Sequence, residues 1–172
     1  QAADISGLAS ESRLPIVLTL GADLSEDQKS QILQFFGIDQ SEVTTITITN
    51  ADEKEKLGNL ISAEKIGSYT YSCALVNPTN AGGIQVKTAN LNYVTSNMIA
   101  SQLSTSGVYN CEVLTAAPFE VSGTGALTGV MMAYEEASGA QLDEGKKELA
   151  VLREAQFHPV REEILHLDFY RI

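Results

Sequence analysis

Apolar positions repeat with two different periods along the chain, and each period predicts one kind of element. Residues 14–21, LPIVLTLG, form a continuous apolar run closed by a glycine, which predicts a buried strand. Residues 42–50, EVTTITITN, alternate instead, so Ile46 and Ile48 face one side of a strand and the intervening threonines face the other. Both patterns predict strands of a sheet.

Helical periodicity occurs in four segments, each opened by a side chain suited to capping. Ser25 begins the first, with Gln28 three residues on to complete a capping box, and Gly37 ends it in the left-handed conformation. The inner face of this helix consists of Ile32, Leu33, Phe35 and Phe36. The expected caps of the helices over 51–60, 96–107 and 123–139 are Asn50, Thr95 and Ser122.

Three further segments carry strand patterns, namely 67–78, 84–93 and 109–119. In the first of these, Tyr69, Tyr71, Cys73 and Leu75 share a face. The turn residues NPTNAGG separate the first two segments and predict that they pair as a hairpin. Residues 141–150 predict one more, weaker helix.

This order of elements predicts the α/β class in its α+β form, a mixed β-sheet covered by helices on at least one face. We expect two domains. Residues 1–145 form the α/β domain, and residues 146–172 form an extension that holds a helix end and a C-terminal β-hairpin with Pro159 near its turn.

Charge is distributed unevenly along the chain. It has 22 acidic and 11 basic residues and a formal net charge of −11, but the residues from Lys146 onward are neutral as a group. An acidic body repels phosphate backbones and anionic membrane surfaces, so we expect no nucleic-acid partner. No apolar run approaches the roughly 18 residues that a membrane span requires, so we expect no membrane insertion.

The two cysteines, Cys73 and Cys111, fall in predicted strands. An even pair suits an oxidising compartment, and we expect a disulfide, with two buried free thiols as the alternative. The chain begins at Gln1 and not at Met, which fits either a processed export substrate or a trimmed chain. These features favour a secreted or cell-envelope location.

Three stretches of the chain carry a family resemblance. They are TLGADLS, TNADE with the LG that follows it, and APFEVSGTGALTG, all within residues 14–145. Together they closely resemble the secreted YpuA-type family of unknown function from Gram-positive, spore-forming bacteria. The resemblance implies export to the envelope or the medium, and it brings no established activity, cofactor or catalytic residue.

The C-terminal segment departs from that family. REAQFHPVREEILHLDFYRI is similar to a segment of the bacterial large-subunit ribosomal protein family that binds 5S RNA, in which this pattern forms two paired strands. The rest of that RNA-binding domain, with its basic surface, has no counterpart here, so RNA binding is not carried over. A genuine extension, a fusion and a wrong assignment of residues are all compatible with this segment.

Two motifs invite a catalytic interpretation. GTGALTG, residues 123–129, is rich in glycine, but no lysine follows as a phosphate loop requires, so we expect close packing of a helix against the sheet. Ser122 is a candidate nucleophile whose activation requires a base, and the only histidines are His158 and His166 in the tail. We therefore expect Ser122 to cap a helix and predict no catalytic residue.

Metal binding has weak support. His158, His166 and Asp168 are candidate ligands, because a paired hairpin places such side chains near one another. A surface face of the hairpin explains them equally well, and we expect no cofactor. The acidic clusters, such as SEDQ with Glu26 and Asp27, do not match a calcium loop and suit a helix start.

The leading hypothesis is a non-enzymatic exported protein that contacts a protein partner or copies of itself. In this hypothesis the C-terminal hairpin adds strands to a neighbouring subunit, and the contact residues are Leu165, Leu167, Phe169 and Tyr170. Two alternatives remain open. One is a cell-wall or peptide hydrolase, and the other is a small-ligand-binding module with a cleft beside the APFEVSGTG helix start.

Overall fold

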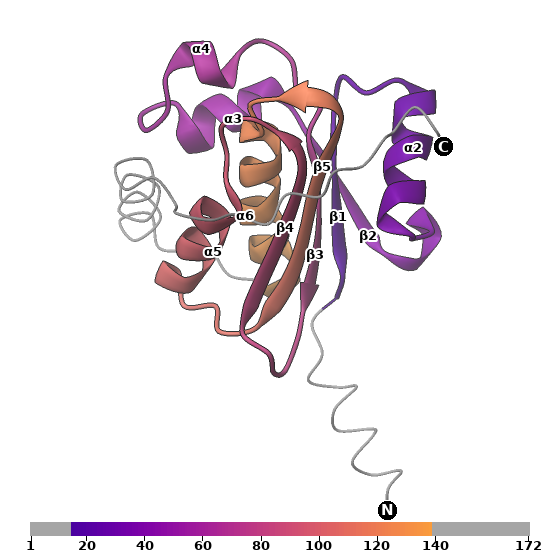
Figure 1. Ribbon diagram of the computed structural model, residues 1–172, viewed down its shortest axis with the longest axis vertical. Helices are drawn as coiled ribbons and strands as arrows, with labels where there is room; N and C mark the ends of the chain where they lie inside the picture. Colours follow the sequence, from indigo (N-terminus) through magenta and orange to yellow (C-terminus); the bar gives the residue numbers. More distant parts are fainter. Residues whose placement is uncertain (1–14, 139–172) are drawn as a thin grey trace, which may run out of the picture.

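The computed structural model describes residues 15–138, which form one β-sheet flanked by helices (Figure 1). The elements in chain order are β1 (Val17–Gly21), α2 (Glu26–Phe36), the short 3-10 helix η1 (Gln40–Glu42), β2 (Thr44–Ile48), α3 (Asn50–Leu57), α4 (Ala63–Ile66), β3 (Cys73–Pro78), β4 (Ile84–Leu91), α5 (Ser96–Thr105), β5 (Cys111–Val121) and α6 (Thr124–Ser138).

The sheet has five strands in the order β2-β1-β3-β5-β4. β1 is parallel to β2 and β4 is parallel to β5, whereas β3 is antiparallel to both β1 and β5. Four strands therefore end at the same edge of the sheet, called here the carboxyl edge. The predicted mixed α/β sheet is confirmed, while the boundary at residue 145 and the C-terminal hairpin lie outside the described residues.

The hairpin predicted from NPTNAGG is wrong, because β5 lies between β3 and β4. Val113 of β5 pairs with Val76 of β3 on one side and with Val86 of β4 on the other. β5 is long and largely apolar, as a strand with two neighbours must be, whereas β4 carries Lys87 and suits an edge. The two parallel strands then need a crossover connection, which α5 supplies.

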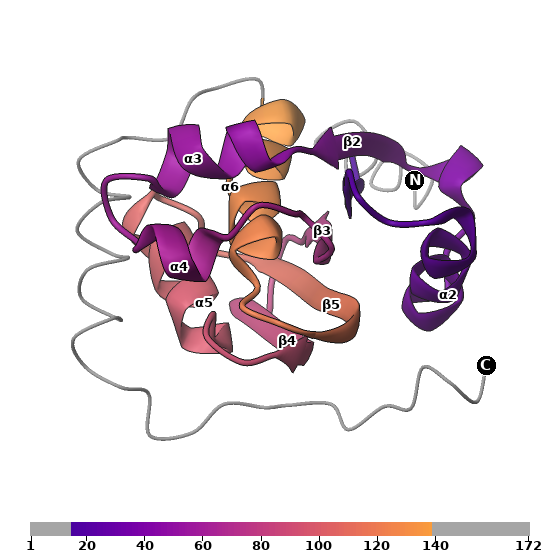
Figure 2. The same cartoon turned by 90° about the horizontal axis from the view of Figure 1, so that it is seen from above.

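The two largest hydrophobic cores of residues 15–138 occupy opposite faces of the sheet. On one face α3, α4, α5 and α6 form a layer, and α2 is the helix of the described range that lies on the other (Figure 2). The larger core, beneath the four helices, includes Leu57, Ile99, Leu103, Leu127 and Met131. The smaller core packs Ile32 and Phe36 of α2 against Leu18 and Leu75 of the sheet. Helices thus cover both faces.

The capping residues show how local sequence sets the helix ends. Ser25 and Gln28 form the predicted capping box of α2, and Gly37 ends the helix at a φ of 68°. The expected cap of α3 is one residue off, because Thr49 and not Asn50 accepts the backbone N–H of Asp52. Thr95 caps α5 as predicted.

Glycines bring α6 close to the sheet, which confirms the packing interpretation of GTGALTG. A Cβ added to Gly125 would lie 2.7 Å from Cγ2 of Thr70, and one added to Gly129 would overlap Oγ1 of Thr19. Since no larger residue fits at either position without movement, these glycines place the helix directly against β1 and the segment before β3.

Candidate functional site

The three family-like stretches meet at the carboxyl edge. One follows β1, one follows β2 and opens α3, and one follows β5 and opens α6. Asp23 joins the first to the segment before β3, because its N–H donates to the Thr70 carbonyl at 3.1 Å and its carboxylate accepts the Thr70 N–H at 2.8 Å. Stretches far apart in the sequence therefore share one neighbourhood around Thr70.

Glu53 is the charged centre of this neighbourhood and is only 1% exposed. Its carboxylate accepts hydrogen bonds from Thr124 Oγ1 at 2.6 Å, from Thr70 Oγ1 at 2.7 Å and from Asn50 Nδ2 at 3.2 Å. These donors offset the cost of burying a charge. The carboxylate also lies at the first turn of α6, where the helix dipole favours negative charge. Glu53 thus fastens α3, α6 and the segment before β3 together.

Ser122 lies beside this cluster, with its Oγ 3.3 Å from Oγ1 of Thr124. The cap expected from Ser122 comes instead from Ser72, whose Oγ accepts the backbone N–H of Ala126 in α6 at 2.7 Å. Sequence reasoning missed Ser72 because it lies 54 residues from its partner. The bases that a nucleophilic Ser122 needs, His158 and His166, lie outside the described residues.

The predicted disulfide is wrong, because Cys73 and Cys111 are buried free thiols. The register pairs Cys73 with Ala116 and Cys111 with Pro78, so the cysteines lie at opposite ends of the β3–β5 ladder. They also belong to the cores on opposite faces of the sheet, where their side chains cannot meet. The cysteine pair therefore gives no support to an oxidising compartment.

Burial makes both thiols poor nucleophiles. It raises the pKa of Cys73 to about 12. Burial, together with the negative charge of Glu112, raises the pKa of Cys111 to about 11. Because the thiolate is the reactive form, both cysteines are inert at neutral pH in the folded protein.

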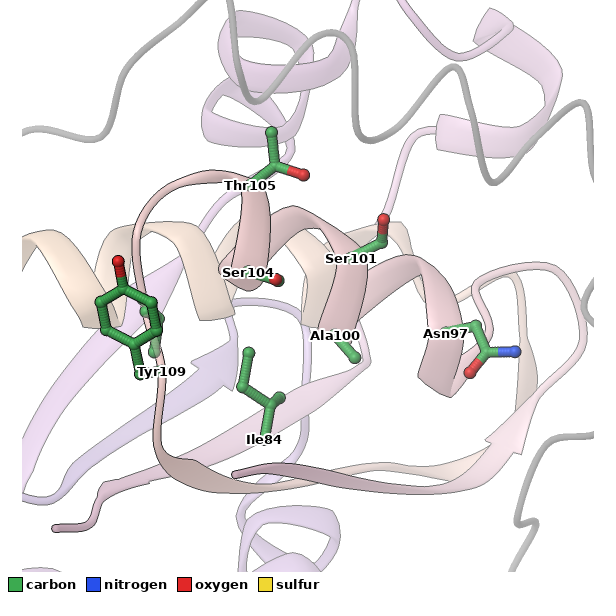
Figure 3. Close-up of a pocket in the computed structure, with 8 residues that line it drawn as sticks. Ile84, Asn97, Ala100, Ser101, Ser104, Thr105 and Tyr109 are labelled. Carbon is green, nitrogen blue, oxygen red and sulfur yellow. The ribbon is translucent and has the colours of Figure 1, made fainter. Parts of the chain in front are cut away.

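An open groove of about 470 Å³ runs between α5 and the start of β4 (Figure 3). Figure 3 shows Ile84 below α5, on the side toward which Ala100 points, and Tyr109 at one end of the groove. The lining residues are Ile84, Asn97, Ala100, Ser101, Ser104, Thr105, Val108 and Tyr109. None of them is charged, and Tyr109 is 82% exposed.

The lack of charge in this groove contrasts with the rest of the fold. Residues 15–138 contain 13 acidic and five basic residues, whereas α5 contains neither kind. A segment without charges can therefore approach the groove without desolvating an ionised side chain. The groove has the chemistry of a contact surface for a neutral or apolar partner.

Among residues 15–138, β4 has no neighbouring strand on one side, and its first residue, Ile84, lines the groove. The Cys111 N–H donates to the Gly83 carbonyl at 3.1 Å, so the backbone groups of odd-numbered β4 residues face β5. Thr88, further along the strand, is only 1% exposed, but by the same alternation the N–H and C=O groups of Ile84 and Val86 point away from β5. No hydrogen-bond partner for them occurs among residues 15–138. Such a row can pair with another strand.

Several predicted site residues lie outside the described part of the chain. They are the candidate metal ligands His158, His166 and Asp168 and the contact residues Leu165, Leu167, Phe169 and Tyr170. Within residues 15–138, no three His, Cys, Asp or Glu residues lie close enough to share a metal ion. No helix in the same range has the length and apolar character of a membrane span.

Comparison with known proteins identifies relatives for most of the chain. Residues 20–160 match the family described as "Protein of unknown function (DUF1002)". The chain is 41% identical over 136 residues to the uncharacterised protein YpuA of Bacillus subtilis, a match that covers 78% of this chain and 47% of that protein. The chain therefore spans about half the length of this relative.

A short segment matches a different protein. Over 29 residues the chain is 59% identical to the large ribosomal subunit protein bL25 of Bacteroides thetaiotaomicron and, equally, of Bacteroides fragilis. Each match covers 17% of this chain and 15% of the ribosomal protein. No solved structure matches the chain significantly. The family match and the match to YpuA confirm the resemblance to the YpuA-type family that the sequence analysis describes.

Proposed function

The chain belongs to the DUF1002 family of unknown function, and from this premise we propose that it is an exported cell-envelope or extracellular protein that acts through protein–protein contacts without catalysis. The observation that carries the proposal is the uncharged α5–β4 groove in an otherwise acidic molecule. A surface that combines an exposed tyrosine, small neutral side chains and a free strand edge suits binding to another polypeptide. Export is part of the proposal and rests on the expectation that the sequence resemblance to the YpuA-type family carries.

The arrangement around Glu53 also favours contact over catalysis. Its side chain is buried and accepts hydrogen bonds from three donors, so it is not presented to a substrate. A hydrolase needs an accessible acid or base within reach of the reacting group. The hydrolase alternative would have to use other residues.

The finer form of the proposal is self-assembly through the C-terminal segment. Its alternating apolar residues Leu165, Leu167 and Phe169 suit a strand that pairs with a neighbouring copy. A homo-oligomer joined in this way needs no cofactor and no nucleic acid.

Light scattering of the purified full chain over a range of concentrations tests this proposal. The mass should rise above the monomer mass of 18.5 kDa as concentration increases. The double variant Leu165→Asp/Leu167→Asp should remain at the monomer mass, because charged side chains cannot be buried in the contact. A full chain that stays monomeric at every concentration would overturn self-assembly.

A further inference from the structure

We infer that the α5–β4 groove is the acceptor for residues 163–171 of a second copy of this chain, which pair with β4 as a sixth strand. This inference rests on the proposed self-assembly and names the surface that receives the segment. Three matches support it: backbone, side-chain pattern and charge.

The backbone match comes from the edge of β4. Ile84 and Val86 present their N–H and C=O groups outward, Thr88 is buried, and Leu91 ends the strand beyond a bulge at which Asn90 has a φ of 64°. The regular stretch before that bulge offers a repeating ladder to an incoming strand. A strand added there would satisfy these backbone groups and would extend the sheet without a break.

The side-chain match concerns the face toward α5. Ile84 and Val86 pack on the larger core, so an added strand places every second side chain on this same face. In residues 163–171, EILHLDFYR, the apolar side chains of Leu165, Leu167 and Phe169 recur with this spacing. They would enter an uncharged groove whose α5 wall consists of small residues, which leave room for them. The same spacing puts Glu163 and Arg171 on this face too, at the two ends of the segment.

The charge match concerns the opposite face. Lys87 lies on the face of β4 away from Ile84 and Val86, and in an added strand Asp168 would lie on the face away from Leu167. An added strand would thus bring an acidic side chain to the side of the sheet that carries Lys87. Opposite charges on neighbouring strands are favourable, whereas a uniformly acidic partner would be repelled.

The length of the chain allows the exchange between copies. Residues 139–162 connect the end of α6 to the segment, and 24 residues reach at most about 80 Å when fully extended. A domain of about 120 residues has a radius of gyration of about 14 Å, so this reach spans a neighbouring copy. One copy can therefore supply its segment to the groove of the next.

Blocking the groove while leaving the segment intact tests the inference. Ser104→Arg places a long, charged side chain in the groove from an exposed position of α5, and Ser30→Arg places the same group on an exposed position of α2, behind the sheet. By light scattering of full chains, Ser104→Arg should raise the apparent dissociation constant at least about tenfold. Ser30→Arg should leave it unchanged.

A second variant and a competitor guard against indirect effects. Tyr109→Ala removes an 82% exposed ring at the end of the groove and should also weaken association, with an unchanged thermal unfolding transition. A synthetic peptide of residues 160–172 should compete with association, and a scrambled peptide should not.

The possible outcomes separate this inference from the proposed function. If Leu165→Asp/Leu167→Asp prevents association but Ser104→Arg and Tyr109→Ala do not, another surface receives the segment and this inference fails alone. If the full chain is monomeric and binds the peptide only after Leu165→Asp/Leu167→Asp, the segment occupies the groove of its own chain, which also contradicts the exchange. If neither association nor peptide binding occurs, both the inference and self-assembly fail.

Discussion

At the scale of single residues, buried polar groups define how the family-like stretches are held. Glu53 accepts hydrogen bonds from Asn50, Thr70 and Thr124, and Ser72 caps α6 from a distant position. The stretches TNADE and VSGTG are therefore joined through hydrogen bonds to the Glu53 side chain.

Glu53→Ala should destabilise the fold by about 2–4 kcal/mol, because it leaves two buried threonine hydroxyls without their acceptor and opens a cavity. Glu53→Gln, which keeps an acceptor oxygen, should lose less, about 1 kcal/mol. Urea unfolding measures both. Glu55→Ala, at an exposed position of the same helix, serves as the control and should change little. Equal losses for Glu53→Ala and Glu55→Ala would show that the cluster is not structural.

The cysteines support a second prediction, on alkaline stability. An unperturbed cysteine thiol has a pKa of 9.0, and in the folded protein the pKa rises to about 12 for Cys73 and about 11 for Cys111. Between pH 9.0 and these folded-state pKa values, the thiols of the unfolded chain have lost protons that the folded chain retains. The stability that the protonated thiols contribute is therefore fully present below pH 9 and falls as the pH rises further.

The measurement is urea unfolding at about pH 8 and about pH 10.5, for the natural chain and for Cys73→Ala/Cys111→Ala. The double variant should lose less stability on going to the higher pH than the natural chain does. If both proteins lose the same free energy of unfolding between the two pH values, the thiols do not contribute to the pH dependence.

At the scale of elements, most helices and strands follow from local pattern, and their neighbours do not. The alternation of β2, the capping box of α2 and the glycine end of that helix are all local and appear as predicted. The pairing of β4 with β5, and not with β3, depends on how an eleven-residue apolar strand is best buried. That preference involves the whole sheet, so a turn signal between β3 and β4 misleads.

Close contact between α6 and β1 gives a prediction at this scale. Helix propensity alone predicts that Gly129→Ala stabilises α6 by about 1 kcal/mol. The contact with Thr19 predicts the opposite sign, a loss of about 1–3 kcal/mol, because the added Cβ has no space. Thermal or urea unfolding decides between them, and a stabilised variant would disprove the close packing.

At the scale of the whole molecule, sequence reasoning recovers the fold class and family but not the site. The three family-like stretches are recognisable as letters, yet their meeting around Thr70 appears only when the strands are assembled. The α5–β4 groove is not predictable from local pattern, because its lining comes from three separate segments: α5, β4 and the loop before β5. A helix of ten residues without charge, in an acidic chain, was the available signal.

The most direct test of the central claim is amide hydrogen exchange in the associated full chain, compared with Leu165→Asp/Leu167→Asp. The account predicts that association slows exchange at Ile84 and Val86, whose N–H groups face outward from β4. Thr45 and Thr47, which occupy the same outward positions on β2, should exchange equally fast in both proteins. An associated protein in which β4 stays unprotected, or in which β2 is protected instead, would contradict it.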